Sequence, residues 1–553
     1  MRFLLSRRHI GFLAGLCVVM AVPTALSAAE PASSSRVTTP DELAAWIDGR
    51  MADHFAKSST APPPLVDDAT FLRRAYLDLV GTLPAVSEVR DFLADQSDLK
   101  RTRLVDRLLA DPRFPPHQAR TWRRVLVSDP SMAATFGAQV EQWLTEQFAQ
   151  NTAFDELTRK LVTAGGAQPQ ADANEEEEED DENAAARAQS AAVSYLRSTG
   201  GDPASVAGSV SRVFLGVRIE CAQCHDHPFT DWKQQDFWGI AAFFAGARYN
   251  RPAPPAANGN NRERPPTTDE RLTSITPPDI GRTYEAGFFW DGDAKPEIPD
   301  DKLPRQVFAD WLTSPKNPHF AATGVNRVWQ QLCGQGLTES VDDLDRADEA
   351  ARAVVLDDLA QHFAGHGFDL KWLISGICRS KAYQFAPTAT TTAAEESEKI
   401  RVRPLKVLAP EQVFDALEVA LALPISRLDD GPRYNGQRNA MIERLGESAS
   451  SSPDKFRGGI PQMLMLMNGV VTAEATSLDT SRTLRAVVDA PFLDDAEKIQ
   501  TLFLATLTRP PSEVEARRLK EHVEKRAADG ENGKAYAEIL WALINSPEFM
   551  LIR

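Results

Sequence analysis

The chain has 553 residues, of which 25% are charged and 42% hydrophobic, and its formal net charge is −17. This length allows roughly two to four domains with a substantial buried core. Eight of the carboxylates lie in one run, residues 175–182, and the sequence contains no comparable block of basic residues. An acidic chain of this kind lacks the charge pattern that nucleic-acid binding requires, so nucleic acid is excluded as a partner.

The first 29 residues have the organisation of a secretory signal peptide. Arg2, Arg7 and Arg8 precede an apolar run over residues 10–22, and small residues follow up to Ala29. The run is too short to span a bilayer and has the length of a signal-peptide core. We therefore expect cleavage after Ala29, a periplasmic or secreted protein, and no membrane span in the mature chain.

Residues 36–248 predict a first helical domain. Thr39, Pro40 and Glu42 are typical of a capped helix start. Apolar residues at helical spacing continue in several later segments, one of which is broken at Gly81 and Pro84. These segments are residues 71–95, 97–114 and 136–164.

The acidic run interrupts this helical pattern near residues 168–190. Eight like charges in a row repel one another and bury no apolar surface, so we expect a solvated, disordered insert. A calcium-binding loop is the alternative, but the run lacks the spaced Asp, Asn and Gly residues of such a loop.

The most informative motif is CxxCH, formed by Cys221, Cys224 and His225. This pattern attaches haem covalently in c-type cytochromes, where both thiols bond to the haem and the histidine ligates its iron. A helical turn would place the two thiols on one face. An apolar helix is expected before the motif, and a second one, capped by Asp231, after it. An exported c-type cytochrome-like protein is therefore the leading hypothesis.

Two alternatives for this motif stay open. Cys221 and Cys224, together with His225 or His227, could form part of a tetrahedral zinc site, although the sequence identifies no fourth ligand. In an exported protein the two thiols could also form a disulfide. Either alternative would make the chain a non-redox binding or scaffold protein, with no haem attached.

Residues 249–302 are rich in Pro and Asn and predict a linker, with short extended pieces around residues 284–290. Helical patterns return over residues 303–553, which predict a second helical domain. The fold class expected for the whole chain is therefore mainly α.

Other residues are weaker candidates for a functional role, because an ordinary structural role also explains each of them. A methionine run could supply a sixth iron ligand but is more often core packing. Two histidines four residues apart are compatible with a metal, but a surface position at a fraying helix end also explains them. Two acidic pairs are compatible with acid–base catalysis, but helix caps and solvated faces are the more common explanation. Two further cysteines could pair or remain as buried thiols. No set completes a catalytic signature, so enzymatic activity stays open. The residues are Met463, Met465, Met467, His362, His366, Asp342, Asp343, Asp357, Asp358, Cys333 and Cys378.

Several segments resemble the secreted planctomycete proteins that join a cytochrome-like domain to a second planctomycete-type domain, both of unknown function. In the first domain these are FLRRAYLDLVGTLP, residues 71–84, and FLGVRIECAQCHDHPFTDWKQQDFWGIAAFFA, residues 214–245. In the second they include LPRQVFADWLTSPKNPHFAATGVNRVWQQLCGQGL, residues 303–337, and WALINSPEF, residues 541–549. The resemblance implies haem c at Cys221, Cys224 and His225, and a redox partner protein in the cell envelope.

Overall fold

The structure is a computed structural model that describes residues 37–165, 191–247, 271–290, 295–345, 349–387, 403–422, 438, 441–442 and 476–552. The predicted signal peptide, the acidic run and the methionines Met463, Met465 and Met467 lie outside these residues. Helices dominate the described part, and the two sheets found there have only two strands each. The predicted mainly α fold is confirmed. No helix in the described ranges has both the length and the apolar character needed to cross a membrane.

Short helices make up the N-terminal part of the fold. The predicted start of the first helix is confirmed: the Glu42 amide donates to Thr39 Oγ1 at 3.2 Å, and the Thr39 amide donates to Glu42 Oε2 at 3.0 Å. The predicted break at Gly81, which has a φ of 77°, separates the second helix from the third. The elements are α1 (Pro40–Lys57), α2 (Asp68–Leu79), α3 (Val86–Ala94), α4 (Lys100–Leu109), α5 (Phe114–Leu126), α6 (Pro130–Ala149) and α7 (Phe154–Thr163).

The middle of the chain carries the CxxCH motif between short elements. These are α9 (Pro203–Val210), a π-helical turn η1 (Ser211–Leu215), a 3₁₀ turn η2 (Glu220–Gln223), α10 (Gln234–Ala242) and the paired strands β1 (Ser274–Ile275) and β2 (Tyr284–Glu285). The prediction that Asp231 caps the following helix is wrong. That helix begins two residues later, after Lys233, because the Asp236 carboxylate accepts the Lys233 amide at 2.7 Å.

The C-terminal part is again helical, with one small sheet. Its elements are α11 (Pro304–Leu312), α12 (Pro318–Cys333), α13 (Glu349–Gly365), α14 (Leu370–Arg379), α15 (Lys381–Gln384), β3 (Lys406–Val407), α16 (Pro410–Ala420), α20 (Arg482–Val488), α21 (Asp495–Leu507), α22 (Glu513–Ala528), α23 (Asn532–Ile544) and β4 (Leu551–Ile552). Strand β4 pairs antiparallel with β3, so the end of the described chain returns to residues 406–407.

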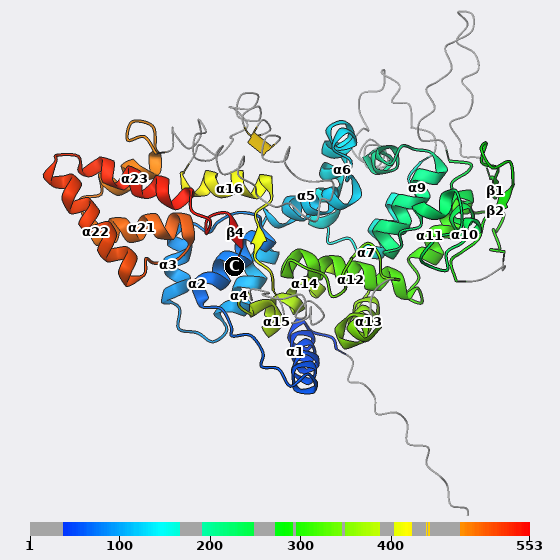
Figure 1. The fold of residues 1–553 in the computed structure, drawn as a ribbon, viewed down its shortest axis with the longest axis horizontal. Coiled ribbons are helices and arrows are strands. Elements are labelled where there is room, and N and C mark those ends of the chain that lie inside the picture. Colours follow the sequence, from blue (N-terminus) through cyan, green and yellow to red (C-terminus); the bar gives the residue numbers. More distant parts are fainter. Residues whose placement is uncertain are drawn as a thin grey trace, which may run out of the picture. The chain divides into compact units, whose positions relative to one another are not determined.

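Elements from the two ends of the sequence pack against each other. Residues Thr38–Arg553 form one compact unit, within which α1 packs on α14 and α7 packs on α11. Helix α3 contacts α21, and β4 contacts α2, as Figure 1 also shows. Leu77 and Leu83 belong to the same apolar core as residues from α16, α21 and α23. The domain boundaries predicted near residues 248 and 303 stay a prediction.

Candidate functional site

The CxxCH motif lies on a short turn whose apolar residues are buried and whose thiols are exposed. The π-helical turn η1 ends at Gly216, which adopts a left-handed conformation with a φ of 61° and redirects the chain. Ile219 and Ala222 are then fully buried, whereas Cys221 and Cys224 are exposed. Cys221 lies in the 3₁₀ turn, and Cys224 directly follows the turn with a helical backbone conformation, so the two cysteines are about one turn apart along the chain. The thiols are free and accessible together.

Helix α10 fixes the backbone of the motif through hydrogen bonds to its carbonyl groups. Gln234 Nε2 donates to the Cys224 oxygen at 2.9 Å, and the indole of Trp238 donates to the Gln223 oxygen at 3.0 Å. The hydroxyl of Tyr284, from β2, donates to Gln234 Oε1 at 2.7 Å and orients its amide. The motif is therefore held by side chains that come from beyond it in the sequence.

The ring of His225 is set in one tautomer by its backbone neighbour. Its Nδ1 lies 2.7 Å from the carbonyl oxygen of Asp226. Because a carbonyl oxygen can only accept, Nδ1 carries the proton and donates it. The neutral ring then has its lone pair on Nε2, and the side chain is exposed. Histidines that ligate metals in proteins commonly donate their other ring N–H to a carbonyl in this way.

His227 has the opposite arrangement. The backbone N–H of Phe229 donates to His227 Nδ1 at 3.2 Å, so Nδ1 is the acceptor and a neutral ring carries its proton on Nε2. Coordination through Nε2 would require the other tautomer and the loss of this hydrogen bond. Of the two histidines, His225 is the one whose Nε2 lone pair is available to a metal in the observed hydrogen-bond arrangement.

Aromatic side chains hold the loop that follows the motif. The Trp232 ring lies 4.6 Å from Phe289 and 5.8 Å from Trp290, between ring centroids, and its indole N–H donates to Asp345 Oδ2 at 2.8 Å. Phe229, in contrast, is 81% exposed. The loop is thus anchored on one side and presents an apolar ring to solvent on the other.

The alternative metal ligands are not assembled into a site. Within the ranges that the structure describes, no three His, Cys, Asp or Glu side chains form a group that could hold a metal ion. His362 and His366 each pack on a different tryptophan: the first lies edge-on to Trp46 at 4.9 Å, and the second stacks on Trp372 at 4.2 Å. Burial lowers the pKa of His362, so its ring is neutral at pH 7.

The other two cysteines within the described residues are Cys333 and Cys378, which are both free and buried. Burial raises the pKa of each thiol, so both are protonated at neutral pH. The structure therefore describes them as small buried side chains, one of the two roles that the sequence left open.

Two of the acidic candidates, Asp342 and Asp358, serve as ion-pair partners. The expectation of a solvated face is wrong for Asp342, which is 5% exposed. Its carboxylate lies 2.6 Å from Arg327, 3.2 Å from Arg218 and 3.7 Å from Arg212. Asp358 pairs with Arg50. A carboxylate surrounded by arginines is held in its charged form and is poorly suited to accept protons.

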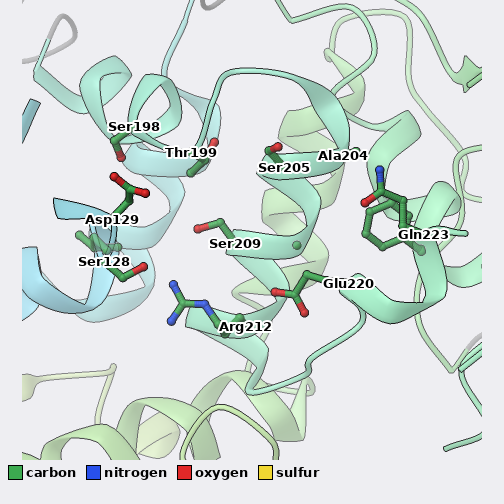
Figure 2. Close-up of a pocket in the computed structure, with 13 residues that line it drawn as sticks. Ser128, Asp129, Ser198, Thr199, Ala204, Ser205, Ser209, Arg212, Glu220 and Gln223 are labelled. Carbon is green, nitrogen blue, oxygen red and sulfur yellow. The ribbon is translucent and has the colours of Figure 1, made fainter. Parts of the chain in front are cut away.

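A polar pocket beside the motif was not predicted from the sequence. Its volume is about 320 Å³, and it is lined by residues from 126–129, 198–212 and 220–223 together with Phe237 of α10 (Figure 2). Glu220 and Gln223, which flank Cys221 and Ala222 in the turn, form one wall. The other lining residues are Leu126, Ser128, Asp129, Ser198, Thr199, Ala204, Ser205, Gly208, Ser209, Arg212 and Phe237. Only the helical spacing of Ser205, Ser209 and Arg212 could have signalled a shared polar face.

Two protein families match the chain, one in each half. PSCyt2, a protein of unknown function (DUF1549), matches residues 46–249, which include the CxxCH motif. PSD1, a protein of unknown function (DUF1553), matches residues 304–453. No match was found among curated proteins or among solved structures. The resemblance inferred from the sequence is confirmed, and the chain belongs to the proteins in which a PSCyt2 domain precedes a PSD1 domain, a pair of unknown function.

Proposed function

We propose that this chain is an exported c-type cytochrome-like protein that carries haem on Cys221 and Cys224, with His225 as an axial ligand. Its role would be electron transfer or redox support for a partner protein at the cell envelope. The observation that carries the proposal is the hydrogen bond of the His225 ring. Its Nδ1 donates to the Asp226 carbonyl, which leaves the Nε2 lone pair for iron next to two exposed free thiols.

The donor set around the motif fits covalent haem. Thioether attachment requires two reachable thiols three residues apart, and both cysteines are free and exposed. Bound haem would supply a one-electron carrier whose potential depends on its axial ligands and surroundings. The chain's own contribution is rigidity: Gln234 and Trp238 hold the motif's carbonyls, so the thiols and His225 keep their relative positions.

The family name supports a cytochrome-like role, since PSCyt2 covers the motif. The predicted signal peptide adds a second argument. Export would bring the thiols to an oxidising compartment, where they are expected to end in a disulfide or bound to a cofactor. A periplasmic or secreted location belongs to this proposal.

The proposal is tested by producing the full chain, with its signal segment, in a bacterium that has the c-type cytochrome maturation machinery. We expect the purified protein to absorb in the Soret region and to keep its haem on a denaturing gel. The double variant Cys221→Ala with Cys224→Ala should lose the haem entirely. One equivalent of zinc without covalent haem in the unmodified protein would instead support the structural metal site, and a Cys221–Cys224 disulfide the scaffold alternative.

The two neighbouring histidines provide a matched pair of variants. His225→Ala removes the proposed ligand and should change the Soret and visible bands of the attached haem. His227→Ala removes a ring whose Nδ1 is already used by the Phe229 amide, so the spectrum should stay that of the unmodified protein. Equal spectra for both variants, or a change in His227→Ala alone, would contradict the assignment of His225.

A further inference from the structure

The pocket beside the CxxCH turn has walls that are unusually rich in hydroxyl groups. Five Ser and Thr side chains line it, together with two carboxylates, one amide and one guanidinium. Hydroxyls both donate and accept, carboxylates only accept, and guanidinium only donates. A pocket with this lining offers interleaved donors and acceptors, and its surface is more polar than apolar, with Leu126 and Phe237 as the large apolar side chains. Figure 2 shows these side chains around one open space.

One wall of the pocket comes from a continuous helical face. Ser205, Ser209 and Arg212 are four and three residues apart along α9 and η1, so they project on the same side. Gly208 belongs to this face, and a Cβ there would lie 3.0 Å from Glu220 Cγ. The absence of a side chain at Gly208 is what lets Glu220 lie against the helix.

The opposite wall is built from the loop before α6 and from the end of a helical segment over residues 191–198. Ser128 and Asp129 come from the segment between α5 and α6, and Ser198 and Thr199 from the segment before α9. Asp129 caps α6 through Oδ1, which accepts the Ser131 and Met132 amides at 2.8 and 3.1 Å. The capping bonds fix the direction in which this carboxylate faces, and Figure 2 shows it next to Ser198.

The pocket contains charged groups of both signs: the carboxylates of Asp129 and Glu220 and the guanidinium of Arg212. Arg212 makes two long contacts with described residues, 3.4 Å to the Val125 carbonyl and 3.7 Å to Asp342. Glu220 lies close to it in Figure 2. Asp129 and Glu220 would repel an anionic ligand, and Arg212 would repel a cationic one.

We propose that this pocket binds a small neutral polyhydroxylated molecule, recognised by its vicinal hydroxyl groups. Such a ligand can donate to Asp129 and Glu220 and accept from Arg212, while the Ser and Thr hydroxyls pair with either kind of group. The volume of about 320 Å³ is at the small end of ligand pockets. Because Glu220 and Gln223 flank Cys221, a bound molecule would lie beside the CxxCH turn. The proposal does not depend on haem being attached there.

Ligand-observed saturation-transfer NMR on the purified full-length chain tests the proposal. The probes are methyl β-D-glucopyranoside as a cyclic sugar and sorbitol as an acyclic polyol, which share vicinal hydroxyls but differ in shape. D-glucuronate and D-glucosamine serve as anionic and cationic counterparts. We expect transfer to at least one neutral probe, and a dissociation constant at least tenfold lower than for either charged probe.

Two variants locate the binding. Ser205 is exposed at the pocket wall, so Ser205→Trp should occupy the pocket without disturbing the core and should weaken binding at least tenfold. Ser128→Trp blocks the opposite wall from an exposed position and should act in the same way. Thr135→Trp, at an exposed position of α6 that does not line the pocket, is the control and should leave binding unchanged. Circular dichroism verifies that each variant is folded.

Three outcomes would overturn the proposal. The first is that neither neutral probe binds. The second is that a charged probe binds as tightly as the neutral ones. The third is that folded Ser205→Trp and Ser128→Trp proteins bind the probe as well as the Thr135→Trp control does.

Discussion

Backbone partners assign opposite roles to two histidines that are only two residues apart. His225 donates from Nδ1 to a carbonyl, and His227 accepts an amide N–H at the same ring atom. The sequence left both residues open as metal ligands, because a tautomer depends on which backbone group faces the ring. The conformation of the turn supplies that information, and it favours His225.

Gly216 is the residue on which the position of the motif depends most directly. It has a φ of 61°, and a Cβ there would lie 2.8 Å from Leu344 Cγ. We predict that Gly216→Ala lowers the free energy of unfolding by about 2–4 kcal/mol, from backbone strain and overpacking together. Gly530→Ala is the control, since Gly530 has a φ of 76° but no atom within 4 Å of such a Cβ.

Urea unfolding of the two glycine variants separates these two contributions. Backbone strain alone should cost Gly530→Ala about 1 kcal/mol. Equal losses in both variants would mean that the neighbours of Gly216 relax around the added methyl group.

At the scale of elements, a buried ion cluster joins the chain before the motif to α12. Asp342 accepts from Arg327 of α12, which also donates to the Val213 carbonyl of η1 at 2.9 Å. Arg218, between η1 and the motif, lies 3.2 Å from the same carboxylate. The position of the CxxCH turn relative to α12 therefore depends on a charge network, in addition to apolar packing.

The pH dependence of stability should reveal this cluster. Burial raises the pKa of Asp342, but Arg327 and Arg212 outweigh burial, so the pKa in the folded protein is lower than the ordinary 3.8. A depressed pKa stabilises the fold above that ordinary value, and this contribution is lost as the pH falls through the folded-state value.

We predict that Asp342→Asn lowers the free energy of unfolding at pH 7 by about 3 kcal/mol, because Arg327 loses its buried partner. The difference from the unmodified protein should shrink as the pH falls below 3.8. Urea unfolding at pH 7 and near pH 3 measures both effects, and Asp279→Asn, at an exposed carboxylate, is the control. A loss that is independent of pH would contradict the charge argument.

At the scale of the whole molecule, the PSCyt2 and PSD1 parts share buried groups. Asp78 of α2 has a fully buried side chain, and its carboxylate accepts the Tyr383 hydroxyl at 2.9 Å and pairs with Lys406. Leu77 and Leu83 belong to one apolar core with residues from α16, α21 and α23. Neither part buries its own apolar and charged groups completely.

We therefore predict that residues 303–553, expressed without the preceding chain, are unstable. Removal of α2 would expose the core around Leu77 and leave Lys406 without Asp78, and exposed apolar surface promotes aggregation. Circular dichroism and size-exclusion chromatography measure the result against the intact protein. A soluble segment with cooperative unfolding would contradict this and would favour two independent domains.

The sequence by itself determined the helical class, the capped start at Thr39, the break at Gly81, the CxxCH motif and the family. These features depend on local chemistry or on patterns of neighbouring residues, which can be recognised in one dimension. Tertiary structure alone decided the tautomer of His225, the burial of Asp342 among three arginines, and the polar pocket beside the motif. The tautomer of His225 depends on the backbone conformation of the turn, which brings the Asp226 carbonyl to the ring. The ion cluster and the pocket need side chains from segments far apart in the chain, and no local pattern records which segments meet.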